Sequence, residues 1–160
     1  MPYDRMLAEL FRDEDRARNM ASRLMQLAQA SPAEAARERL QLAEFIHGPM
    51  DKHMSYEERF IFPQLARRGL GEELQVAEKH HASIRQYADK LQAATAEQAP
   101  QLIFETARLL LHHTNFECDY IYPELTHKEW IALMKESAEQ ESGPSGPFGP
   151  GTSDAPSRRP

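Results

Sequence analysis

The chain has 160 residues, with 19 Lys and Arg against 25 Asp and Glu, so its formal net charge is −6. This length suits one domain, or one domain and a tail, and the acidic balance argues against binding to nucleic acid or to an anionic membrane. No apolar run approaches the ~20 residues of a membrane-spanning helix, and the charged N-terminus has no secretory leader pattern. A single cysteine, Cys118, excludes an internal disulfide and a thiolate metal site. We therefore expect a cytoplasmic protein that binds neither nucleic acid nor membrane.

Apolar residues recur at spacings of three and four along most of the chain, which is the period of an amphipathic helix. The first helix is predicted over residues 3–30 and the second over residues 31–68. Ser31 is the expected N-cap of the second helix, because a proline follows it and Glu34 completes a capping box. We expect a bend at Gly48-Pro49, where the proline removes a backbone donor and clashes with the preceding turn.

Two glycines, Gly69 and Gly71, mark the turn into a third helix, whose apolar positions run from Leu74 to Leu91. The fourth helix is predicted to open at Pro100 and to run to Tyr120. A short fifth helix follows Thr126, which is a favourable N-cap residue.

Residues 142–160 hold four of the seven Gly and five of the eleven Pro. This composition predicts a disordered tail, because such a segment buries too little apolar surface to offset its ordering entropy. No segment alternates with a period of two. The expected fold is therefore all-α: an up-down-up-down four-helix bundle over residues 1–141, with a short C-terminal fifth helix and a disordered tail.

Two stretches of eleven residues match without a gap: HMSYEERFIFP from His53 and HTNFECDYIYP from His113. In each, a glutamate four residues after the histidine, Glu57 or Glu117, shares the helical face of that histidine and of the aromatic positions. Each helix therefore aims an imidazole and a carboxylate at the apolar interior, where unpaired charges cost several kcal/mol. A metal ion removes that cost, because both groups are metal ligands.

A third histidine lies at the same depth in the bundle. His81 is about 10 residues, roughly 15 Å, into the third helix, and Glu57 is roughly 16 Å from the end of the second. Two parallel helices with matching motifs and this inward histidine predict one shared site with the ligands His53, Glu57, His81, His113 and Glu117. Mixed imidazole and carboxylate ligands with two potential bridges favour iron over zinc.

These residues resemble the hemerythrin-like (HHE cation-binding) family, over roughly residues 3–135, chiefly through the two repeated motifs and the KHHASIR segment between them. The resemblance implies a four-helix bundle that holds a non-haem di-iron centre. It implies that Glu57 and Glu117 bridge the irons while the histidines are terminal ligands. It also implies a small diatomic partner, oxygen or nitric oxide, or a role in redox sensing or iron storage and protection.

The chain departs from the family pattern in two places. The first helix contains no histidine, and Glu14 on its apolar stripe is the natural substitute as a ligand. The alternative is that Glu14 is solvated near a wet end of the bundle, with the site closed by water or by His47. Arg85 stands where oxygen-carrying members have a second histidine in the third helix, which argues against reversible oxygen carriage.

Five other residues are candidates of lesser weight. His80 and His112 neighbour predicted ligands but point about 100° around the helix, which predicts outer or surface roles. His47 lies off the ligand face, His127 is expected at the surface, and Cys118 is interpreted as a small packed residue rather than a redox thiol.

Three functions remain open from the sequence. The first is a hemerythrin-like iron protein in oxygen, nitric-oxide or redox sensing, or in iron storage and protection. The second is a di-iron enzyme that turns over peroxide or donates iron for cluster repair, although no substrate pocket is indicated. The third is a metal-free helical interaction module. A ferritin-type di-iron bundle, which uses E-x-x-H pairs, is disfavoured because the three such pairs here have unlike flanking residues.

Overall fold

The computed structural model describes residues 2–122 and 125–141, and within them all regular structure is helical. In chain order the elements are α1 (Pro2–Ala30), α2 (Pro32–Ala36), α3 (Arg39–Phe45), η1 (Ile46–Met50), α4 (Asp51–Tyr56), η2 (Glu57–Ile61), α5 (Phe62–Ala66), α6 (Gly71–Ala93), α7 (Ala99–Tyr120) and α8 (His127–Glu141). The two elements labelled η are short π-helical turns. The predicted disordered tail, 142–160, lies outside the described residues.

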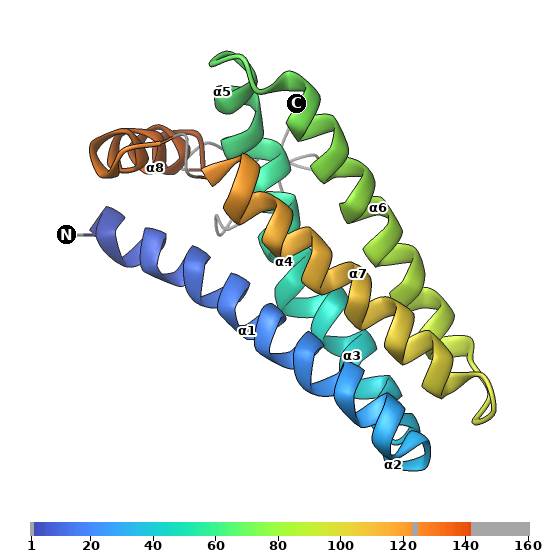
Figure 1. Ribbon diagram of the computed structural model, residues 1–160. Helices are drawn as coiled ribbons and strands as arrows, with labels where there is room; N and C mark the ends of the chain where they lie inside the picture. Colours follow the sequence, from blue (N-terminus) through green and yellow to red (C-terminus); the bar gives the residue numbers. More distant parts are fainter. Residues whose placement is uncertain (1, 123–124, 142–160) are drawn as a thin grey trace, which may run out of the picture.

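The long elements form an up-down-up-down bundle, as the sequence predicts (Figure 1). α1 and α6 run in one direction, while α7 and the run from α2 to α5 return in the other. α7 packs against both α1 and α6, and α3 packs against α6. The fifth helix, α8, crosses one end of the bundle, where it contacts α1 and η2. Among the described residues, no helix combines the length and apolarity needed to cross a membrane.

The second helical run is less regular than the sequence predicts. One bent helix is expected over 31–68, but the structure has three α-helical pieces after α2, joined by η1 and η2. The predicted bend at Gly48-Pro49 falls inside η1, where the π turn absorbs the missing proline donor. η2 begins at Glu57 and was not expected. π turns inside helices are rare and occur frequently at functional sites.

Two apolar clusters fill the interior of the bundle. One lies toward α2 and includes Leu24, Leu42, Ile103 and Leu110, all of which are buried. The other lies toward α8 and includes the buried residues Ile61, Leu65, Ile121, Trp130 and Leu133. On α1, α6 and α7 the predicted ligands fall between buried residues of the two clusters, so that apolar layers close the polar interior on both sides.

The two predicted N-caps behave differently. Ser31 precedes α2 as expected, but its side chain makes no capping hydrogen bond. Its backbone N–H instead donates to the Leu27 carbonyl at 2.8 Å, so α2 follows directly from the last turn of α1. Thr126 makes the full reciprocal cap: the Glu129 N–H donates to Thr126 Oγ1 at 3.2 Å, and the Thr126 N–H donates to Glu129 Oε1 at 2.9 Å.

This difference predicts unequal stability effects at two similar positions. The change Thr126→Ala removes a cap and is expected to lower the free energy of unfolding by about 1 kcal/mol. Ser31→Ala is expected to change it by no more than a few tenths, because no capping bond is lost. Urea denaturation followed by circular dichroism measures both. Equal losses in the two variants would contradict this account of the helix ends.

Candidate metal centre

Six ionisable side chains from all four bundle helices meet between the apolar clusters. Each is at most 3% exposed: Glu14 on α1, His53 on α4, Glu57 on η2, His81 on α6, and His113 and Glu117 on α7. These are the six residues that the sequence predicts as metal ligands, and the structure brings all of them together. The solvated alternative for Glu14 is wrong, because its side chain is buried. Ligation itself stays a prediction.

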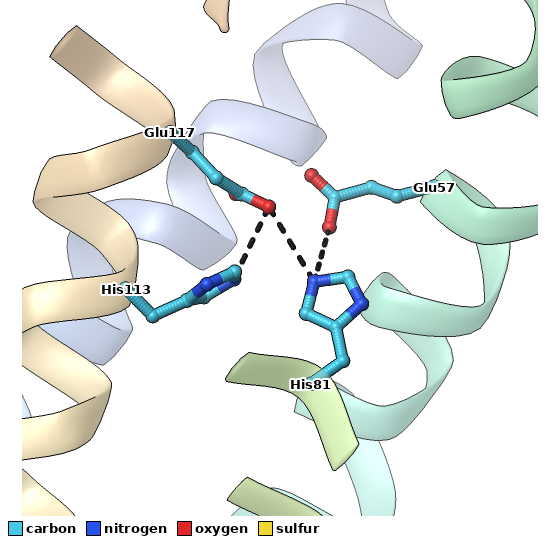
Figure 2. Close-up of side chains that lie close together, drawn as sticks. All are labelled: Glu57, His81, His113 and Glu117. Carbon is cyan, nitrogen blue, oxygen red and sulfur yellow. Dashed lines mark ion pairs between the residues drawn. The ribbon is translucent and has the colours of Figure 1, made fainter. Parts of the chain in front are cut away.

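Four of the six residues form a first group, shown in Figure 2. His113 Nε2 lies 3.1 Å from Glu117 Oε2, and His81 Nε2 lies 3.4 Å from the same oxygen. His81 Nε2 also lies 3.5 Å from Glu57 Oε1. One potential ligand atom from each of the four residues lies within 4.8 Å of the others. Two imidazoles and two carboxylates therefore face one small volume.

A second group shares both carboxylates with the first. Glu14, His53, Glu57 and Glu117 also place potential ligand atoms within 4.8 Å of one another. His53 Nε2 lies 3.3 Å from Glu57 Oε2 and 3.5 Å from Glu14 Oε2. The two oxygens of Glu57 consequently face different groups, because Oε1 is near His81 and Oε2 is near His53.

The three histidines share one orientation. Each turns Nε2 toward the centre and Nδ1 toward an outer side chain. The outer contacts are Asp13 Oδ2 at 3.4 Å from His53, Glu58 Oε2 at 2.6 Å from His81, and His80 Nδ1 at 3.2 Å from His113. Metal-bound histidines characteristically donate their second ring N–H to a carboxylate, a backbone carbonyl or water, which fixes the ring orientation. The contact of His81 with Glu58 is of this kind, whereas Nδ1 of His53 lies at ion-pair distance from Asp13 without a hydrogen bond.

Glu58 was not identified from the sequence, and the local backbone explains its role. Because η2 begins at Glu57, the adjacent residues Glu57 and Glu58 reach the two nitrogens of the same His81 ring, one on each side. Arg85 Nη1 donates to Glu58 Oε2 at 3.0 Å, and Arg85 Nε donates to Asp51 Oδ1 at 2.6 Å. Arg85 is thus held outside the centre, where it orients Glu58.

The remaining predicted residues lie where their helix faces place them. His80 is half-buried against His113, whereas His112 and His127 are exposed. His47 is exposed with Nε2 at 3.0 Å from Asp89 Oδ1, which contradicts the alternative in which it closes the site.

Cys118 is half-buried and its sulfur accepts a hydrogen bond from Arg18 Nη2 at 2.9 Å. Burial raises the pKa of this thiol, which disfavours the reactive thiolate.

Burial and mutual proximity shift the pKa values of the central groups in opposite directions. Burial, together with the charge of Glu117, raises the pKa of Glu14 well above its usual value. Burial opposes protonation of His53, but the charge of Glu57 and the side-chain contacts with Asp13, Glu14 and Glu57 together outweigh burial and raise the histidine pKa. Burial also disfavours ionisation of Glu117, yet His113, with further contacts from His81 and Glu14, holds that pKa well below its usual range. In the absence of a cation, the raised pKa values of His53, His81 and Glu14 favour protons on these groups, which offset the buried negative charge.

The same groups satisfy a test for metal binding. Both carboxylate oxygens of Glu14, Glu57 and Glu117, and Nε2 of all three central histidines, are buried without a hydrogen-bond partner among the described residues. Buried polar atoms are normally hydrogen-bonded, so this many buried atoms whose contacts are only ion pairs among themselves require an explanation. Carboxylate and imidazole are ligands for iron, manganese and zinc. The residues present therefore fit a metal centre.

A comparison with protein families agrees with this geometry. The family model of the hemerythrin HHE cation binding domain matches residues 5–125. This segment contains all six central residues and ends before α8. The chain has no significant match among curated proteins or among solved structures. With three quarters of its length matched, and with a buried His and Glu cluster that fits a cation, the chain belongs to the hemerythrin family of HHE cation-binding domains.

Proposed function

We propose that the chain holds a non-haem di-iron centre in the core of the bundle. The observation that carries this proposal is that Glu57 and Glu117 belong to both four-residue groups. A single ion needs only one of these groups. The two groups share two carboxylates, and the oxygens of one of these, Glu57, face different histidines. This arrangement suits a pair of bridged ions.

The donor set supports iron as the metal. Structural zinc sites are usually closed by four ligands and are commonly rich in cysteine, whereas this chain has one cysteine, and it lies outside the six central residues. Mixed imidazole and carboxylate donors are typical of non-haem iron with open positions. Bound iron would supply redox chemistry and an open position for a small diatomic ligand, oxygen or nitric oxide.

The protein residues would bind and orient the ions and restrict access of water. Phe62 stacks on the His81 ring with centroids 5.5 Å apart, and the apolar clusters close the site along the bundle axis. Arg85 is engaged by Asp51 and Glu58, so α6 contributes one imidazole. This favours a role in cytoplasmic sensing of oxygen, nitric oxide or redox state, or in iron storage and protection, over reversible oxygen carriage.

Iron loading of the full-length chain tests the proposal. We expect two irons per chain after anaerobic addition of ferrous iron and removal of the excess, and a charge-transfer absorption of the bound iron after exposure to air. His113→Ala is expected to lose one of the two irons and to weaken the absorption strongly. His112→Ala changes the exposed neighbouring histidine and should leave both unchanged. Full iron content in His113→Ala would contradict this site. Rapid peroxide turnover by the loaded protein would instead favour the enzymatic function.

A further inference from the structure

The two halves of the bundle have equivalent side-chain contacts around the centre, and this equivalence includes α1 and α6, which the sequence repeat does not relate. The sequence repeat relates His53 to His113. In the structure, the residue facing Nδ1 of each is also in an equivalent place. Asp13, which directly precedes Glu14 on α1, lies 3.4 Å from His53, and His80, which directly precedes His81 on α6, lies 3.2 Å from His113.

Two arginines extend this correspondence. Arg18 and Arg85 lie four residues after Glu14 and His81, respectively. Arg18 faces the helix of His113, and Arg85 faces the helical run of His53. Each arginine contacts two side chains there, which lie two and five residues after that histidine. The contacts are Arg18 with Asn115 at 3.4 Å and Cys118 at 2.9 Å, and Arg85 with Ser55 at 3.4 Å and Glu58 at 3.0 Å.

This internal symmetry makes Glu14 the counterpart of His81. The two four-residue groups are therefore built alike except at one position, where α1 presents a carboxylate and α6 an imidazole. With the shared Glu57 and Glu117, the group around His81 and His113 offers two imidazoles and two carboxylates. The group around Glu14 and His53 offers one imidazole and three carboxylates.

We propose that the two metal positions are chemically unequal and select different divalent ions. The position of His81 and His113, called the imidazole-rich position, fills first with iron or zinc. The position of Glu14 and His53, called the carboxylate-rich position, fills second and accepts manganese. Imidazole suits iron and zinc, while carboxylate suits manganese. A carboxylate in place of an imidazole at one position therefore shifts the metal preference of that group toward manganese. This inference rests on the proposed dinuclear centre.

Sequential loading of the full-length chain with two metals tests the inference. One equivalent of zinc is added first, followed by manganese, and bound metal is measured by elemental analysis and by manganese EPR. We expect one zinc and one manganese per chain, with the EPR signal of isolated manganese. Glu14→Gln keeps the side-chain size but removes the carboxylate, and is expected to weaken manganese binding about tenfold or more while retaining zinc.

The symmetry supplies a matched variant. His81→Ala is expected to weaken binding of the first zinc and to leave manganese binding largely unchanged. Glu14→His makes the two groups alike, and is expected to let a second zinc displace manganese. Circular dichroism of each variant verifies that the bundle is folded.

The possible failures are distinguishable. If the unsubstituted chain binds two zinc ions with equal affinity and excludes manganese, the unequal positions are wrong although the dinuclear centre stands. If Glu14→Gln binds manganese as tightly as the unsubstituted chain, the assignment of the carboxylate-rich position is wrong. If the unsubstituted chain binds no more than one ion under any loading, the dinuclear centre of the proposed function is itself wrong.

Discussion

Glu117→Ala is expected to remove both metals from the centre, whereas His81→Ala removes only one. Glu117 belongs to both four-residue groups, and its Oε2 is within 3.4 Å of Nε2 of both His81 and His113. Losing a bridge deprives two ions of a ligand at once, while losing a terminal imidazole deprives one. Iron per chain after anaerobic loading, determined by a colorimetric chelator, measures the difference.

A control for this experiment is available on the same helix. Asp119→Ala changes an exposed carboxylate two residues away and should leave two irons per chain. Glu117→Gln preserves the side-chain volume and separates loss of the charge from loss of packing; it too is expected to lose both ions. If Glu117→Ala kept one tightly bound iron, this carboxylate would be a terminal ligand and not a bridge.

Removal of the metals is expected to lower Tm by about 10 °C. Ligand binding to the folded state adds about 4 kcal/mol when free ligand is a thousandfold above Kd, and each kcal/mol shifts Tm of a chain this long by roughly 2–4 °C. The buried carboxylates and imidazoles of the centre are tolerated only with protons or a cation among them. Scanning calorimetry with and without a strong chelator measures the effect.

The change Glu14→Leu is expected to have opposite effects in the two states. In the metal-free protein it removes a buried carboxyl whose pKa is raised by burial and by the charge of Glu117, so Tm should rise. In the loaded protein it removes a predicted ligand, so the increase in Tm on adding iron should shrink. Glu9→Leu, at an exposed position of the same helix, should alter neither. An equal response to iron in Glu14→Leu and the unsubstituted chain would exclude Glu14 as a ligand.

Helix ends were predictable where a proline or a good cap residue marks the start of the helix. α7 begins beside Pro100, and α8 begins directly after Thr126. The π turns were not predictable, because one extra residue in a helical turn leaves the spacing of the neighbouring apolar residues almost unchanged. Ser31 has the residue type of a cap, but the tight connection to α1 gives its backbone a different partner.

The central residues were predictable because each lies on the apolar face of its own helix, and face assignment needs only local periodicity. Glu14 was identified in this way although its depth was uncertain. Among the outer contacts, His80 was expected in an outer or surface role, whereas the contacts of Asp13 and Glu58 were not predictable, since they depend on how neighbouring helices cross. Each nevertheless directly adjoins a central residue in the chain. A polar residue directly beside a predicted buried ligand in the chain is therefore a sequence signal for an outer contact of this kind.

The up-down-up-down path has a consequence for how metal enters and leaves. One helical hairpin, from α1 to α5, carries Glu14, His53 and Glu57, and the other, α6 with α7, carries the other three. Each hairpin thus holds three of the four residues of one group. The fourth residue of that group is the shared glutamate of the other hairpin, Glu117 or Glu57. Pulling the hairpins apart breaks both groups in a single event. We therefore expect the dissociation rate of bound ions to follow opening of the α1–α7 contact, and expect a loaded chain to resist both proteolysis and amide exchange there.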